Sequence, residues 1–259
     1  MKLTFNILFF VLFPLISFCQ NGLTDYKDII DLDDEYELSR PNLEELKQFD
    51  LSQFWIDNPS ERRFGFIGNN YRRLRIKFLS IIKNNDQPNQ YFIYGKSKVS
   101  DNICPFQGII EIKESYYIKS LEYPNGKTGI LAGEYRFYED PDSNHSGIFK
   151  GRFVTYWYKD EDGIIKYNDL WDVSAMYNNN QFAGNWSAYA KSNIIKANWG
   201  DGRISQSDEL DTGTSEFHAN FKYNSFGWES LNKAWGGGYS EEEMQEARDK
   251  ELETWWKEK

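Results

Sequence analysis

The amino-acid sequence predicts an all-β protein, an antiparallel meander closed into a small β-barrel of about eight strands. An irregular acidic N-terminal arm precedes this barrel, and a C-terminal α-helix follows it. Between residues 65 and 204, segments with apolar residues at every second position alternate with Asn-Gly, Asp-Gly and Asp-Pro turn signals. No run of apolar residues at helical spacing interrupts this region. Connections this short exclude crossover helices, so neighbouring strands must be antiparallel.

Residues 1–19 have the features of a signal peptide: a basic start at Lys2, an apolar run, and small residues at Ser17 and Cys19. Cleavage would then fall before Gln20, and the protein would be exported to the periplasm or secreted. The alternative is a lipoprotein signal, in which Cys19 becomes the lipidated first residue of an anchored protein. No other segment of the sequence approaches the length of a membrane-spanning helix, so no integral span is expected.

Residues 20–60 form the predicted acidic arm, in which aspartates and glutamates far outnumber lysines and arginines. One or two helical turns are expected after Pro41, with Asn42 as the N-cap. Charge runs of this kind are usually solvated extensions, so we expect the rest of the arm to be irregular.

The charge reverses in residues 62–83, which contain seven lysines and arginines and no acid. Arg73, Arg75 and Lys77 alternate with apolar residues, which predicts a strand with these basic side chains on its solvent face. There they are expected to pair with the acidic arm of the same molecule or to remain solvated. Contact with an anionic partner is the alternative.

A glycine recurs between two large apolar residues in four of the predicted strands, and residues two apart share one face of a strand. A glycine there permits a bend and leaves room for a neighbouring ring, and a sheet that closes on itself needs such bends on successive strands. The four glycines are Gly108, Gly133, Gly151 and Gly184. Their uneven spacing excludes a propeller or a solenoid, so we expect one barrel domain over residues 61–235.

This rhythm of strand, glycine and aromatic residue over residues 72–201 resembles that of avidins and lipocalins. The resemblance implies a small meander barrel that holds an apolar or amphipathic ligand. The resemblance lies in the spacing of these residues and not in a shared motif. The Gly-x-Trp at Gly184 to Trp186 comes late in the chain, whereas the lipocalin motif belongs to the first strand. The chain also resembles uncharacterised exported bacterial proteins, a resemblance that implies no function.

Residues 236–259 are expected to form a glycine hinge followed by the C-terminal helix. Ser240 and Glu243 match a capping box, and acids crowd the first turn. The apolar stripe of the helix consists of Met244, Ala247, Leu252 and Trp255. We expect this stripe to pack against the barrel, with a partner protein as the alternative.

The sequence contains no motif for metal, cofactor or nucleophilic chemistry. His145 and His218 lie in dissimilar loops, and residues 140–145 begin like a calcium loop but lack its glycine and its final glutamate. Cys104 is the only thiol that remains after signal cleavage, so no internal disulfide can form. A net charge of −10 is unsuited to nucleic-acid binding. We therefore expect no cofactor and no nucleic-acid partner.

Binding is the function that the composition favours, because nine tryptophans and seventeen tyrosines exceed what a core of this size needs. We expect a non-catalytic binding protein that holds a small apolar ligand or a glycan in an aromatic-lined barrel. The expected lining residues are Tyr135, Phe153, Trp157, Trp171 and Trp186.

Two other functions fit the same sequence. The acidic arm and the tryptophan-bearing C-terminal helix would suit a protein–protein interaction module of the cell envelope. Alternatively, a pair of carboxylates could hydrolyse a glycan, with Asp201, Glu216 and His218 in the regions to inspect. Such a pair leaves no motif, so the sequence alone does not decide between these functions.

Overall fold

The computed structural model describes residues 23–29, 37–56, 63–119, 127–170, 177–189 and 193–257. The predicted signal peptide at residues 1–19 and the predicted lining residue Trp171 lie outside these ranges.

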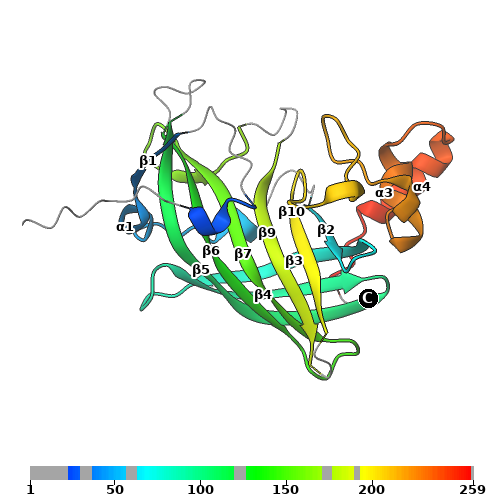
Figure 1. The fold of residues 1–259 in the computed structure, drawn as a ribbon, viewed down its shortest axis with the longest axis horizontal. Coiled ribbons are helices and arrows are strands. Elements are labelled where there is room, and N and C mark those ends of the chain that lie inside the picture. The colour runs from blue at the N-terminus through cyan, green and yellow to red at the C-terminus, as the bar shows by residue number, and fades with distance from the viewer. Residues whose placement is uncertain are drawn as a thin grey trace, which may run out of the picture.

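The described residues form one antiparallel sheet of ten strands (Figure 1). The strands are β1 (Glu37–Pro41), β2 (Arg63–Ile67), β3 (Arg72–Lys83), β4 (Gln90–Val99), β5 (Asn102–Lys119), β6 (Lys127–Glu139), β7 (Gly147–Lys159), β8 (Ile165–Tyr167), β9 (Asn179–Ala188) and β10 (Ile194–Asp201). As predicted, the described residues between Gly65 and Ile204 contain no helix.

Eight of these strands close into a ring. Each strand of the series β2, β3, β4, β5, β6, β7, β9 and β10 pairs with the next, and β10 pairs with β2. The two remaining strands lie beside the ring, where β1 pairs with β5 and β8 with β7. The predicted closed meander of about eight strands is therefore confirmed.

Period-two alternation decides which side chains enter the ring. On β4, Tyr91 and Ile93 are buried in the central core, whereas Phe92 and Tyr94, which alternate with them, are 48% and 46% exposed. On β7, the inward positions carry large rings, including Phe153. Aromatic side chains thus supply most of the volume inside the ring.

The glycines of the strand interiors make room for one of these rings. Gly151 on β7 and Gly184 on β9 lie directly opposite each other, and Tyr135 on β6 is the partner of Gly151 on its other side. A Cβ atom added to either glycine would lie within 2.8 Å of the Tyr135 hydroxyl and within 2.3 Å of a backbone carbonyl oxygen. The register shifts of the sheet occur elsewhere, so these glycines accommodate the tyrosine and form no bulge.

Replacing Gly151 by alanine should therefore destabilise the fold by about 1–3 kcal/mol, because neither the backbone nor the packed ring can withdraw freely. Urea unfolding would measure this loss. Gly237→Ala is the matched control, since nothing lies within 4 Å of a Cβ at that position. Equal unfolding midpoints for Gly151→Ala and the unchanged protein would contradict this account of the glycine pair.

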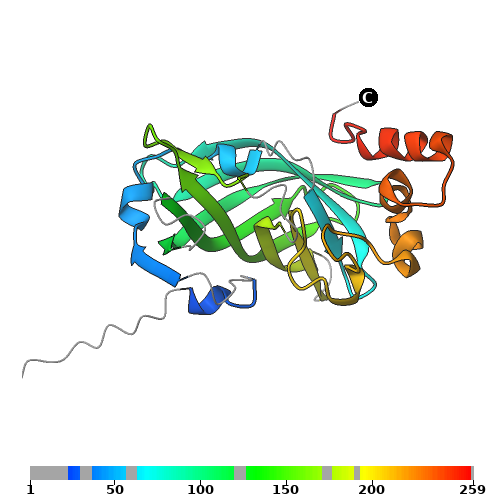
Figure 2. The same cartoon turned by 90° about the horizontal axis from the view of Figure 1, so that it is seen from above.

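The helical segments lie outside the strands of the ring, at its two ends and on its outer face (Figures 1 and 2). They are η1 (Thr24–Tyr26), α1 (Leu43–Leu46), α2 (Gln53–Ile56), η2 (Asp208–Leu210), η3 (Phe221–Phe226), α3 (Glu229–Trp235) and α4 (Glu241–Glu251). The short helix predicted after Pro41 is α1, but the buried side chain of Asn42 makes no capping hydrogen bond.

The described part of the acidic arm packs closely on the ring. Trp55 of α2 is fully buried, with its ring centroid 5.2 Å from that of Tyr91 and 5.8 Å from that of Phe153. The backbone N–H of Leu51 donates a hydrogen bond of 3.1 Å to the Tyr91 hydroxyl. This indole therefore plugs one end of the ring.

The C-terminal region packs on the outside of β2 and β3. Phe66, an outward residue of β2, belongs to a second apolar cluster with Trp228 and Leu231. The predicted capping box is present, because Ser240 accepts a hydrogen bond from the backbone of Glu243, whose side chain accepts one in return. The C-terminal helix packs on α3, but its predicted apolar stripe is not buried as a whole, because Ala247 and Trp255 are buried and Leu252 is 59% exposed.

The outward arginines of β3 pair with this C-terminal helix, and not with the acidic arm as the sequence suggested. Arg73 holds Glu251 with two hydrogen bonds of 2.7 and 2.5 Å, and Arg75 adds one of 3.1 Å. Burial raises the pKa of the Glu251 carboxyl, but Arg73 and Arg75 lower it by more, so the pKa lies below its ordinary value. The carboxylate stays charged and fixes α4 to the ring.

Candidate functional site

The four predicted lining residues that the structure describes pack in or against the central core of the ring. Tyr135, Phe153 and Trp157 are at most 2% exposed and belong to the central core. Trp186 is only partly buried against this core. The structure therefore brings Tyr135 and Phe153 into one aromatic cluster and places Trp186 toward its edge.

Neighbouring rings occupy the space where we expected a ligand. The ring of Phe182 stacks on Trp199 at 5.0 Å and on Phe153 at 5.4 Å, and Tyr135 meets Trp199 edge-on at 5.1 Å. The Tyr135 hydroxyl and the Trp199 indole N–H are buried without a hydrogen-bond partner. Such burial costs free energy, which the packing of the rings must offset.

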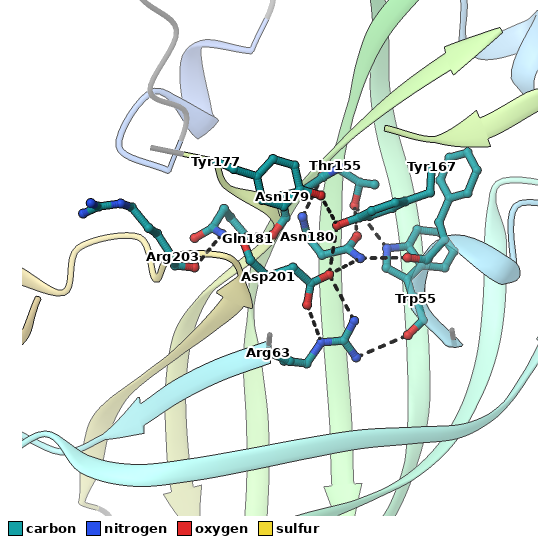
Figure 3. Close-up of polar contacts among 11 residues, drawn as sticks. Trp55, Arg63, Thr155, Tyr167, Tyr177, Asn179, Asn180, Gln181, Asp201 and Arg203 are labelled. Carbon is teal, nitrogen blue, oxygen red and sulfur yellow. Dashed lines mark hydrogen bonds and ion pairs between the residues drawn. The ribbon is translucent and has the colours of Figure 1, made fainter. Parts of the chain in front are cut away.

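A buried polar network centred on Asp201 lies where the ring closes (Figure 3). Arg63 of β2 and Asp201 of β10 are cross-strand partners, and Arg63 donates two hydrogen bonds of 2.8 and 3.2 Å to the carboxylate. Asn180 of β9 donates a third at 2.7 Å, and the Tyr167 hydroxyl donates a fourth at 3.2 Å. Asp201 itself is fully buried.

The network continues to α2. The Trp55 indole donates a hydrogen bond of 3.2 Å to the Thr155 hydroxyl, which in turn donates one of 2.8 Å to Asn180 (Figure 3). Arg63 also donates to the backbone carbonyl of Trp55 at 3.3 Å. The network thus joins the plug to the seam between β2 and β10.

The protonation states of the groups around Asp201 suit a structural role for this network. Burial alone would lower the pKa of Arg63, but the Asp201 carboxylate raises it to above the ordinary value, so the guanidinium stays charged. Burial, with Asp201 as the second cause, raises the pKa of Tyr167, which therefore remains a hydrogen-bond donor. Among the described residues the groups that contact Asp201 are a guanidinium, an amide and a phenol, so no second acid faces it.

The other two residues considered for glycan hydrolysis lie in a loop outside the ring. His218 donates its backbone N–H to Asp211 at 3.1 Å, and Glu216 is exposed on the same loop. A hydrolytic pair needs one carboxyl group free to meet the substrate, whereas four hydrogen bonds occupy that of Asp201.

Substituting Asp201 by asparagine should destabilise the protein by about 3–5 kcal/mol, because the buried Arg63 would lose its counter-charge. Chemical denaturation would measure the loss. Glu37→Gln removes an acid from an exposed ion pair and is the control that should leave stability nearly unchanged. A stable Asp201→Asn protein would show that the pair is not what holds the seam.

A second buried carboxylate, Glu139, lies at the end of β6. It accepts hydrogen bonds from the Ser97 hydroxyl, from the Gly147 backbone N–H at 2.9 Å and from the Trp186 indole at 2.9 Å. No described lysine or arginine pairs with it. Burial raises the pKa of Glu139, and its three donors lower the pKa by less.

This shift predicts a pH-dependent stability. Because folded Glu139 holds its proton to a higher pH than the unfolded chain, its contribution to stability falls as pH rises through the raised pKa. Glu139→Gln keeps an acceptor for Gly147 and Trp186 without the charge, so its stability relative to the unchanged protein should increase from pH 4.5 to neutral. Urea unfolding at several pH values, with exposed Glu134→Gln as control, measures this difference. A pH-independent difference would contradict it.

The remaining chemical groups give no reactive centre. Cys104 is buried, and burial raises the pKa of its thiol, which leaves the less reactive protonated form. Within the described ranges, no group of three or more histidines, cysteines, aspartates and glutamates could hold a metal ion. The helices of these ranges are also too short and too polar to cross a membrane.

The outer surface of the strand ring carries exposed aromatic side chains that do not belong to the central core. Phe92 and Tyr94 on β4 and Tyr138 on β6 are 48%, 46% and 40% exposed. Gln107 on β5 lies between Tyr94 and Tyr138 as the cross-strand partner of both. The two tyrosines are therefore two strands apart, about 10 Å. We call Phe92, Tyr94 and Tyr138 the outer aromatic face.

A groove of about 890 Å³ begins beside this face and crosses β6, β7, β9 and β10. Ile109, the partner of Phe92, and Ile148, the partner of Tyr138, line its near side. Arg136, Lys150 and Asn185 continue it as cross-strand neighbours. The groove thus combines apolar side chains with extended polar ones, as ligand sites commonly do.

Comparison of the chain with protein-family models, with curated proteins and with solved structures gives no match.

Sequence reasoning did not single out the outer aromatic face, although a signal for it was present. In the segment from Gln90 to Val99, rings occur at Tyr91, Phe92 and Tyr94, so at least one must point outward whichever face is buried. Residues 156–158 also carry three consecutive rings, so at least one must point outward, but Tyr156 is buried and Tyr158 is half-buried.

Proposed function

We propose that the protein is a non-catalytic binding protein that holds an oligosaccharide on its outer aromatic face. The observation that carries this proposal is the exposure of Phe92 and Tyr94 on β4 and of Tyr138 two strands away on β6, next to a polar groove. Large exposed apolar groups gathered in one place are characteristic of binding surfaces.

An oligosaccharide suits this surface better than a compact apolar molecule does. Tyrosine rings present an apolar face and a polar edge, as a sugar ring presents apolar C–H groups and polar hydroxyls. Gln107 between the tyrosines and Asn185 in the groove offer amide donors and acceptors to such hydroxyls. The spacing of the rings favours an extended ligand that contacts several of them.

The packing of the interior, the predicted export and the state of Asp201 also support the proposal. The interior rings pack against one another, with Trp55 closing one end, so an interior ligand would have to displace core side chains. Export, predicted from residues 1–19, would bring the protein to compartments where glycans are accessible. The saturated carboxylate of Asp201 favours binding over hydrolysis.

A panel of immobilised oligosaccharides, followed by calorimetry with those retained, tests the proposal. Each ring should contribute about 1 kcal/mol, so a protein with Phe92, Tyr94 and Tyr138 all changed to alanine should bind roughly a hundredfold more weakly. The fold should be unaffected because all three side chains are exposed.

Phe221→Ala with Trp235→Ala is the matched control, since these rings are 54% and 62% exposed in the C-terminal region. The control protein should bind as the unchanged protein does. Retention of no oligosaccharide, or equal affinity of the triple variant, would refute the proposed site.

A further inference from the structure

The outer aromatic face continues into a row of lysines on the same strand. Phe92, Tyr94, Lys96 and Lys98 of β4 occupy successive outward positions, while the residues between them are buried or, at Gly95, face the core. A ligand lying along β4 would therefore pass from two rings to two ammonium groups.

The neighbouring strand adds positive charge beside these lysines. Lys77 and Arg75 of β3 are the cross-strand partners of Lys96 and Lys98. The Lys77 ammonium lies 4.8 Å from the centre of the Trp256 ring, which is a cation–π contact.

Two acids close to this row are engaged by other cations. Glu251 is held by Arg73 and Arg75, and Glu111 by Lys113 at 2.6 Å. Glu253 also acts on Arg75, whose pKa is lowered chiefly by burial.

By contrast, Lys96, Lys98 and Lys150 make no ion pair with any described residue. Asp140 is hydrogen-bonded through its backbone to Pro105, the partner of Lys96, and its carboxylate accepts the backbone N–H of Asp142. The ammonium groups of Lys96 and Lys98 are therefore available to pair with an anionic ligand.

This local excess stands against a net charge of −10 for the whole chain. A polyanion would be repelled by most of this surface and attracted only where cations gather, so the charge distribution directs it to one face. Aromatic rings stack on sugars, and ammonium groups pair with anions. A surface that has both side by side suits an acidic sugar polymer.

Resting on the function proposed above, we propose that the ligand is an anionic glycan, whose sugar rings stack on Phe92 and Tyr94 while its carboxylate or sulfate groups bind Lys96 and Lys98. DNA and anionic membranes share the negative charge. A nucleic acid would require more phosphate contacts than this short row offers, and a membrane would require a broader apolar surface.

The test compares an oligogalacturonate with its methyl ester, which has the same sugar rings and no charge, and adds a sulfated oligosaccharide. The unchanged protein should bind one of the two acidic probes at least about tenfold more tightly than the ester, and added salt should reduce the difference. Lys96→Gln with Lys98→Gln should remove the preference and leave binding of the ester unchanged.

Lys127→Gln with Lys250→Gln is the control, because these exposed lysines carry the same charge and lie elsewhere. Equal binding of acid and ester, both dependent on the aromatic face, would overturn this inference and leave the proposed function standing. Binding of none of the probes would overturn both. Tighter binding of single-stranded DNA or of phosphatidylglycerol vesicles would overturn the assignment to a glycan.

Discussion

The ring closes along five cross-strand pairs between β2 and β10, and one of them, Arg63 with Asp201, is a buried ion pair. These residues are partners on β2 and β10, 138 positions apart, at the seam where the first and last strands of the ring meet. A buried ion pair stabilises a protein only when its geometry is good and its remaining atoms are satisfied. Here Asn180 and Tyr167 complete the carboxylate, so the condition is met. The same network fixes α2, and with it the indole that fills the end of the ring.

Closing the ring decides where a ligand can bind. An eight-stranded ring has an interior just wide enough for side chains, and this chain fills that space with aromatic ones. The rings fit because Gly151 and Gly184 leave room for Tyr135, which lies across both. The two glycines therefore allow close packing of the core. The many aromatic residues of the sequence serve first to build this core, which contains no disulfide.

Much of this fold follows from the sequence, because its signals are local. Alternation and turn residues predict the strands, and the capping box at Ser240 predicts the start of α4. The closed ring was predicted from the recurring glycines. The partner of Arg73 was not predictable, since Glu251 lies 178 positions away and many acids could have served. Nor could alternation identify the binding face, because strands such as β4 carry rings on both sides and only the assembled ring shows which side is buried.

The segments outside the ring then determine which part of its outer surface stays open. Leu23, Tyr26 and Ile29 cover the outward side chains of Val154 and Ala183 on β7 and β9. The C-terminal region covers β2 and the first part of β3. Between these two covers, the outer faces of β4 and its neighbours remain accessible, and the exposed rings and unpaired lysines occur there. Because exposed apolar side chains gathered in one place mark binding surfaces, we expect binding on the part of the ring that neither of these two described segments covers.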